Sequence, residues 1–322
     1  MLFADKRYYG IQSGSFIGNY KIAYAFLDGS IKNNKISPMD TTAIDKLKEK
    51  AILKANSEHA ERLLLNVQQN KLVESINIIT NKLEENNAED FSYEPGDLYL
   101  KSDTTGTAAG LTSDEIITKA VLELLEKNEM LLLWYGKKGY FLEHNDYIKS
   151  LIKELDLKSP NIDIFVCRNL CNFYTVIAIA YDDEKVTSSG VSVSKSLTEA
   201  ISLALEEAKI IEWANPFTSI SKSNHTDSIN HSKLLKKDLE IYNYNSPKQE
   251  NLIINSFIKT LNIRILNTPS GKRPTTVKCI SKELFNCLPQ KERISLDYNR
   301  QILKEFDIHE DIIKNSPECI LR

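Results

Sequence analysis

Three stretches of the chain carry apolar residues at helical spacing, and runs that favour β-strands separate them. The helical stretches cover residues 43–66, 113–133 and 196–213, and each follows a Ser-, Thr- or Asp-containing capping segment. The runs rich in β-branched and aromatic residues lie at 131–142, 162–166, 173–181, 263–266 and 276–280. The pattern predicts a fold that mixes helices with strands.

Composition excludes several classes of protein. The 322 residues suffice for one large domain or two, and the net charge of -3 without any basic block argues against nucleic acid as the main partner. The first residues lack a signal pattern, and no apolar run approaches the ~20 residues that span a bilayer, so we expect a cytoplasmic protein without membrane contact. The five cysteines form no C-x-x-C pair, which favours reduced, packed thiols.

Some stretches have weaker patterns. Residues 216–250 are rich in Ser, Asn and Lys, and we predict a polar mobile insertion there within a single domain over 1–322. Residues 80–95 are a weaker candidate of the same kind. A helix is expected near 251–260, and the region from Leu284 onward is expected to be partly helical.

The three helical stretches resemble one another. Residues 112–127 align with residues 196–211, which places Glu123 over Glu207. The first stretch joins this alignment with Glu58 at the same point. The similarity indicates an internally repeated unit.

Several glutamates occupy positions on or beside the apolar faces of these helices. Helical geometry places Glu58 on the apolar stripe that contains Ala51 and Ala55, and Glu61 one turn away on the same flank. Glu207 is surrounded by apolar residues, and Glu123 lies at the edge of its stripe with Glu126 one turn further. A buried carboxylate needs a proton or a partner, and Mg²⁺ suits oxygen ligands.

The alternative is that each E-x-x-E pair belongs to a solvated face with ordinary ion pairs. His59 adjoins the first pair and is expected on a neighbouring face, in a surface or supporting role.

The residues around these glutamates resemble the YcaO-domain proteins, which use ATP to activate peptide backbone amides. The most specific segment is 102–135, which is similar to the family's G-x-A-x-G loop, E-x-x-E-R helix and following tryptophan through Gly106, Ala108, Gly110, Glu123, Glu126 and Trp134. Three further segments resemble segments of the family and occur in the family's order: 54–62, 173–210 and 263–289. Segment 173–210 resembles the family's strand, glycine turn and helix.

The resemblance implies an α+β fold in which mixed or antiparallel β-sheets bracket the three related glutamate-bearing helices, with the nucleotide between them. It implies Mg²⁺ ions that bridge the phosphates of ATP and are held by Glu58, Glu61, Glu123, Glu126 and Glu207. Arg62 would face the phosphates. Lys54 and Lys127, which replace the family's serine and arginine, would act as point charges toward them.

The resemblance also implies a reaction. In the family, a Cys, Ser or Thr side chain of a ribosomally made precursor peptide attacks the preceding amide carbonyl, the oxyanion takes phosphate from ATP, and elimination leaves a thiazoline or oxazoline. We therefore expect a cyclodehydratase component for a bacteriocin-like product. Its partners would be the precursor peptide and a protein that binds the leader peptide, and an oligomer is possible. No catalytic side chain is predicted.

Departures from the family pattern keep two alternatives open. Leu203 and Ile210 replace an arginine and a glutamine, and the glycine-lysine-glycine stretch before the first helix is missing, which together suit a degenerate scaffold subunit of a modification complex. The C-terminal segment has one proline, Pro317, where ring-forming members commonly have a proline-rich tail, so thioamide or amidine formation is the second alternative.

Overall fold

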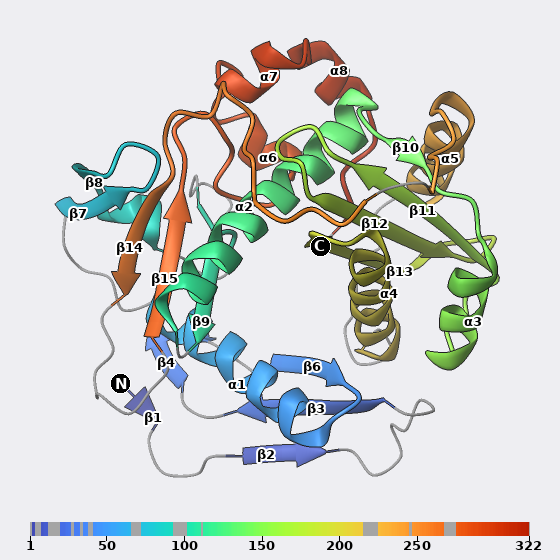
Figure 1. Cartoon of the computed structure of the whole chain (residues 1–322), viewed down its shortest axis with the longest axis horizontal. Coiled ribbons are helices and arrows are strands. Elements are labelled where there is room, and N and C mark those ends of the chain that lie inside the picture. Colours follow the sequence, from blue (N-terminus) through green and yellow to red (C-terminus); the bar gives the residue numbers. More distant parts are fainter. Residues whose placement is uncertain are drawn as a thin grey trace. The chain divides into compact units, whose positions relative to one another are not determined.

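The computed structural model in Figure 1 divides the chain into two compact units. It describes residues 2–3, 8–11, 20–26, 29–32, 35–37, 41–65, 72–92, 102–110, 112–214, 225–244, 247–266 and 275–321. Unit 1 comprises Met1–Leu124, Phe257–Leu288 and Ser295–Gln301, and unit 2 comprises Leu125–Ser256, Pro289–Ile294 and Ile302–Arg322. The expected single domain over 1–322 stays a prediction.

The described residues of unit 1 form three antiparallel sheets. The largest has the strand order β8 (Lys82–Asn87), β7 (Leu72–Asn77), β14 (Asn262–Leu266), β15 (Thr275–Ile280) and β9 (Thr107–Gly110). The other two have the orders β2 (Tyr8–Ile11), β3 (Lys21–Phe26), β6 (Thr41–Asp45) and β1 (Leu2–Phe3), β4 (Gly29–Lys32), β5 (Lys35–Ser37).

Helix α1 (Lys48–Leu65) contacts two of the sheets of unit 1. It packs on β3 and β6, as Figure 1 shows, and also contacts β9. Its buried stripe includes Ala51 and Ala55, both fully buried. A short helix, η1 (Ala88–Phe91), places Phe91 in a cluster with Val73 and Ile280. Unit 1 thus brings a helix from early in the chain against the last strand of the largest sheet.

Unit 2 is built on one antiparallel sheet with the order β10 (Tyr140–Phe141), β11 (Asn161–Cys167), β12 (Tyr174–Tyr181) and β13 (Val186–Ser194). Every residue of β12 is buried, and α4 (Leu197–Ala214) packs along β12 and β13 (Figure 1). The remaining helices are α2 (Ser113–Gly136), which begins in unit 1, and α3 (Asp146–Glu154), α5 (His225–Asp238), α6 (Lys291–Ile294), α7 (Gln301–Glu305) and α8 (Glu310–Asn315).

The α+β class with antiparallel sheets is confirmed, as are the three main helices and the strands at 162–166, 173–181, 263–266 and 276–280. The first helix begins at Lys48 instead of residue 43, because residues 41–45 form β6. The partly helical region after Leu284 is confirmed by α6, α7 and α8. Pro269 and Gly271 predict a turn between the last two strands, and this turn lies outside the described residues.

Three local predictions are wrong. Residues 131–136 continue α2 instead of starting a strand, because this run is buried on all sides of the helix from Met130 to Tyr135. Residues 80–95 contain β8 and η1, since polar side chains of β8 are used in hydrogen bonds within the sheet. The described residues form no helix at 251–260.

The structure also corrects the expectation of a polar mobile insertion over 216–250, because residues 225–238 form α5. The polar side chains of α5 make internal contacts: His231 Nε2 lies 2.7 Å from the carbonyl oxygen of Trp134, and Lys236 forms a 3.0 Å ion pair with buried Asp163. Composition alone did not reveal these partners, which come from other elements of unit 2.

None of the described helices combines the length and the apolar character that crossing a membrane requires.

Candidate functional site

Two carboxylates from different helices meet the same edge of β9. The backbone N–H of Thr107 donates to Glu123 Oε2 of α2 at 3.1 Å, and the N–H of Ala109 donates to Glu61 Oε1 of α1 at 2.7 Å. These amides are two residues apart on one strand, so they lie about 7 Å from each other on the same edge. The other edge of β9 pairs with β15. The structure therefore brings together Glu61 and Glu123, which are 62 positions apart in the sequence.

The loop before β9 is fixed by backbone geometry. Gly106 has a φ of +78°, and a Cβ at this position would lie 2.4 Å from the carbonyl oxygen of Cys279. The Cys279 N–H donates to the Gly106 carbonyl at 2.7 Å. A glycine is required here both for the positive φ and for this approach to β15, which sets where the Thr107 amide points.

Lys278 of β15 is a buried cation that sequence analysis missed. Its Nζ donates to the carbonyl oxygen of Thr105 at 3.2 Å and to that of Asp103, and its side chain is fully buried. Burial lowers the pKa of Lys278 to about 8, while the nearby charges of Asp103 and Glu123 oppose this shift. Lysine in a strand beside β-branched residues gave no sequence signal of burial. Its contacts hold the loop that leads into Thr107, the residue that meets Glu123.

Glu61 is a carboxylate of unit 1 whose pKa is raised toward neutral pH. Burial raises its pKa to about 7. The cations Lys119 and Arg62 and the hydrogen bond from Ala109 oppose the shift, and the charge of Glu58 adds to it. A carboxyl held this way changes charge near neutral pH, and a bound cation would favour its ionised form.

The buried face of α1 differs from the predicted one. It runs from Ala55 to His59, which is 1% exposed, while Glu58 remains about one-third exposed and pairs with Arg62. The reason is that the buried stripe advances in steps of four, and a step of four from Ala55 reaches His59. Lys54, predicted to lie near phosphate, forms a 2.8 Å ion pair with Asp45 of β6.

Glu207 repeats the contact that Glu123 makes. The N–H of Val191 on β13 donates to Glu207 Oε2 at 2.6 Å, and both glutamates accept from an amide 16 positions earlier in the chain. Gly190 lies inside β13 rather than in the predicted turn, and a Cβ there would lie 2.0 Å from the carbonyl oxygen of Ala204. The repeat inferred from sequence therefore has a geometric counterpart in α2 and α4.

The remaining predicted residues lie on α2 and α4 in unit 2. Glu126 and Lys127 are mostly buried and form a 2.8 Å ion pair with each other. Leu203 and Ile210 are partly buried. The predicted convergence of all five glutamates on one nucleotide stays a prediction, because Glu58, Glu61 and Glu123 belong to unit 1 and the other two to unit 2.

Glu129 is a buried carboxyl that was not predicted from the sequence, although it lies three positions after Glu126. It accepts hydrogen bonds from the N–H of Asn169 at 2.6 Å, from the Asn169 side-chain amide at 2.7 Å and from the N–H of Leu170 at 2.7 Å. Burial raises its pKa to about 7. These contacts fix the turn after β11 to α2, which is a structural role.

The donor set along β9 fits Mg²⁺ in kind. Mg²⁺ is commonly bound through one or two carboxylates together with phosphate oxygens and waters, rather than by an all-protein cage. Glu61 and Glu123 supply such a pair on two helices. Within the described ranges, no group of three or more His, Cys, Asp or Glu side chains is arranged to hold a metal by itself. A site here would take its remaining ligands from a nucleotide.

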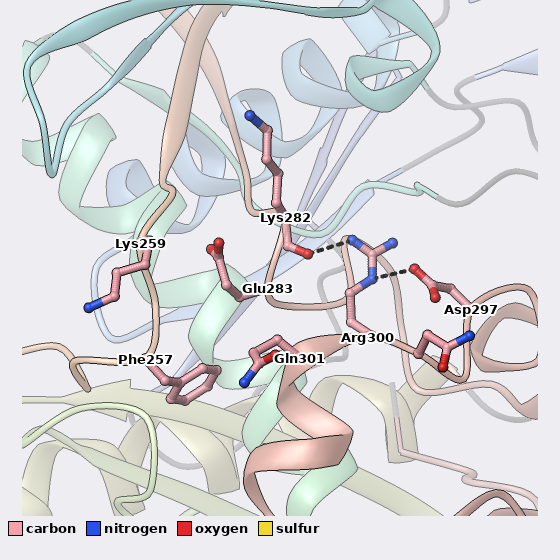
Figure 2. Close-up of a pocket in the computed structure, with 8 residues that line it drawn as sticks. Phe257, Lys259, Lys282, Glu283, Asp297, Arg300 and Gln301 are labelled. Carbon is pink, nitrogen blue, oxygen red and sulfur yellow. Dashed lines mark hydrogen bonds and ion pairs between the residues drawn. The ribbon is translucent and has the colours of Figure 1, made fainter.

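A separate cavity of about 530 Å³ lies elsewhere in unit 1 and is shown in Figure 2. Arg300 on its wall is held by a 3.0 Å ion pair with Asp297 and donates to the carbonyl oxygen of Lys282 at 3.1 Å. Glu283 accepts from Thr260. These charged groups of the cavity have partners in unit 1, and the cavity shares no residue with the β9 edge.

Comparison with known proteins identifies the family. The sequence model of the YcaO cyclodehydratases, described as binding ATP and Mg²⁺, matches residues 86–252, which is more than half of the chain. The chain belongs to the YcaO family. The matched region contains Glu123, Glu126 and Glu207 and the β9 strand, whereas Glu61 precedes it.

Solved structures share the fold at low sequence identity. YcaO from Methanopyrus kandleri, bound with AMPPCP and Mg²⁺, has a TM-score of 0.70 at 13% identity, over 92% of this chain and 88% of that one. The E. coli microcin synthetase McbBCD complex has a TM-score of 0.65 at 13% identity, over 87% of this chain and 88% of that one. A heterocyclase in complex with substrate and cofactor has a TM-score of 0.61 at 13% identity, over 86% of this chain and 50% of that one. No match was found among curated proteins.

Proposed function

We propose that the chain is the ATP- and Mg²⁺-dependent component of a peptide cyclodehydratase. It would activate backbone amides of a ribosomally made precursor peptide and form thiazoline or oxazoline rings in a bacteriocin-like product. The observation that carries the proposal is the pair of family-type carboxylates, Glu61 and Glu123, on one edge of β9. Membership of a family described as binding ATP and Mg²⁺ supports the same assignment.

Each residue of the site has a role in this proposal. Glu61 and Glu123 would hold Mg²⁺, and the amides of β9 keep one oxygen of each carboxylate in place. Arg62 and Lys119 supply positive charge beside Glu61. When bound, Mg·ATP supplies the phosphoryl group and neutralises the charge that develops during its transfer. Glu58, Glu126 and Glu207 are proposed as further ligands, and Lys54 and Lys127 as phosphate contacts.

The partners follow from the same proposal. The substrate is a precursor peptide, and a separate protein binds its leader and delivers the core. The E. coli microcin synthetase McbBCD complex with pro-MccB17 bound, which has a TM-score of 0.59 to this chain at 14% identity, supports this arrangement. We propose a cytoplasmic location for the reaction.

Calorimetry with a non-hydrolysable ATP analogue tests the nucleotide site. We expect binding that requires Mg²⁺ and that disappears in the Glu123→Gln/Glu207→Gln double variant. Glutamine keeps an oxygen for the strand amides of Thr107 and Val191, so the fold should persist while the metal ligands lose their charge.

The matched control is the Glu115→Gln/Glu199→Gln double variant. These exposed glutamates lie in the first turns of the same two helices, and their removal changes the net charge equally. The control should bind the analogue as the wild type does. Equal loss in both variants, or no binding by the wild type with candidate partners present, would contradict the proposal.

A scaffold subunit is the second candidate, and the ion pairs Lys54–Asp45 and Lys127–Glu126 favour it, because both lysines already have carboxylate partners. Formation of a thioamide or amidine is the other variant of the enzymatic proposal. Mass spectrometry of the modified peptide separates thioamide formation from the other two, since ring formation and amidine formation each remove water, whereas replacing the carbonyl oxygen by sulfur adds mass. Fragmentation then separates a ring from an amidine, because only the ring includes a Cys, Ser or Thr side chain.

A further inference from the structure

The largest sheet of unit 1 has one face with exposed aliphatic side chains. Alternate residues of β7 are buried on one face and exposed on the other. The exposed face carries four large aliphatic residues on three adjacent strands, with exposed fractions of 54% for Leu72, 49% for Ile76, 69% for Leu83 and 66% for Ile265. Ile76 and Leu83 are direct cross-strand partners. On the same face Ile263 and Val277, the cross-strand neighbours of Ile76 and Ile265, are buried, so the exposed aliphatic residues lie over β7, β8 and one position of β14. A group of exposed aliphatic side chains on one face is a candidate interaction site.

A pair of like charges lies within this face. Glu74 of β7 and Glu85 of β8 are directly opposite each other, and both share the face of Ile76 and Leu83. Like charges in direct cross-strand register destabilise a sheet. A partner that places positive charge between them would relieve this repulsion.

We infer that this face binds a partner protein through an extended segment that carries aliphatic residues and lysine or arginine at every second position, so that both kinds of side chain point toward the sheet. The aliphatic residues would cover Leu72, Ile76 and Leu83, and the cations would lie over Glu74 and Glu85. The inference does not depend on the proposed nucleotide site, because the face contains none of its residues.

Charge decides between this partner and a second copy of the chain. Two copies joined through the same face would bring two Glu74–Glu85 pairs together, which raises the repulsion instead of relieving it. The other alternative is that the glutamates only discourage aggregation of an exposed sheet near its β8 edge. In that case no cationic segment should bind preferentially at this face.

Fluorescence anisotropy with synthetic peptides tests the inference on the full chain. The probe is a labelled peptide that carries isoleucine and lysine in turn at every second position, with threonine between them, and its matched control carries glutamate in place of lysine. We expect the lysine peptide to bind at least about tenfold more tightly. The Glu74→Gln/Glu85→Gln variant should lose this preference, and high salt should weaken it.

Two more variants locate the binding. The Ile76→Ser/Leu83→Ser variant should bind the lysine peptide at least about tenfold more weakly than the wild type does. The Glu184→Gln/Glu240→Gln variant loses two exposed carboxylates of unit 2, and its affinity for the lysine peptide should equal that of the wild type. Circular dichroism confirms that each variant is folded.

Three results would overturn the inference. They are equal binding of the two peptides, equal loss in the unit 2 variant, and self-association in sedimentation that the Ile76→Ser/Leu83→Ser change abolishes. Calorimetric binding of the ATP analogue is measured in parallel on each variant and should match the wild type, so failure here is distinguishable from failure of the nucleotide site.

Discussion

Replacing Glu61 by glutamine should stabilise the metal-free protein at neutral and alkaline pH. Burial raises the pKa of Glu61 to about 7 in the fold, against an ordinary value of 4.5. The stability that the protonated carboxyl contributes is complete below pH 4.5 and is lost as the pH rises through about 7. A difference of about 2.5 in pKa corresponds to roughly 3 to 4 kcal/mol at about 1.4 kcal/mol per unit. Glutamine retains an oxygen for the Ala109 N–H and carries no charge.

The assay is urea unfolding of both proteins in EDTA at a series of pH values. The variant should exceed the wild type by up to roughly 3 to 4 kcal/mol above pH 7, and the advantage should shrink toward zero near pH 4.5. Glu58→Gln is the matched control, because Glu58 is a partly exposed partner of Arg62 on the same helix. It should lower stability by less than about 1 kcal/mol. A Glu61→Gln protein less stable than the wild type at pH 8 would refute the reasoning.

Three further results are expected. Gly190→Ala should destabilise the protein by about 3 kcal/mol in thermal unfolding, since the new Cβ would lie 2.0 Å from the Ala204 carbonyl oxygen, whereas Ser188→Ala in the same strand should cost less than about 1 kcal/mol. In the Glu61→Gln background, stability should still fall as the pH rises through 7, because burial raises the pKa of Glu129 to about 7, and adding Glu129→Gln should remove this remaining slope. All five cysteines are free and buried, so a thiol reagent should label them only after denaturation.

Long periodic helices and apolar strands were predictable from sequence, and the polar strands β8 and β13 were not. The apolar repeats over α1, α2 and α4 extend for several turns, so their helical period is clear. Strand β13 reads as polar because it contains serines around Gly190, yet Ser188, Ser189 and Ser192 are buried in a strand that packs against α4. No local pattern distinguishes a buried serine from one in a loop.

The candidate site shows the same limit. The sequence located glutamates on α1, α2 and α4, but the helical wheel placed Glu58 on the apolar stripe of α1, where the structure has His59. Only the contact with Ala109 identifies Glu61 as the carboxylate that reaches β9. The loop contacts of Lys278 depend on residues more than 170 positions away, which no spacing rule connects.

The charge of Glu61 also bears on the choice between an enzyme and a scaffold. In either case a carboxylate can accept the N–H of Ala109, so the hydrogen bond itself does not discriminate. A glutamine would make the same bond without the cost of roughly 3 to 4 kcal/mol that an ionised Glu61 carries at neutral pH. A protein that needed only the scaffold would gain stability by losing this charge, whereas one that binds Mg²⁺ needs it. The ionisable carboxyl of Glu61, beside Arg62 and Lys119, is therefore the feature of α1 that a cation site would need and a scaffold would not.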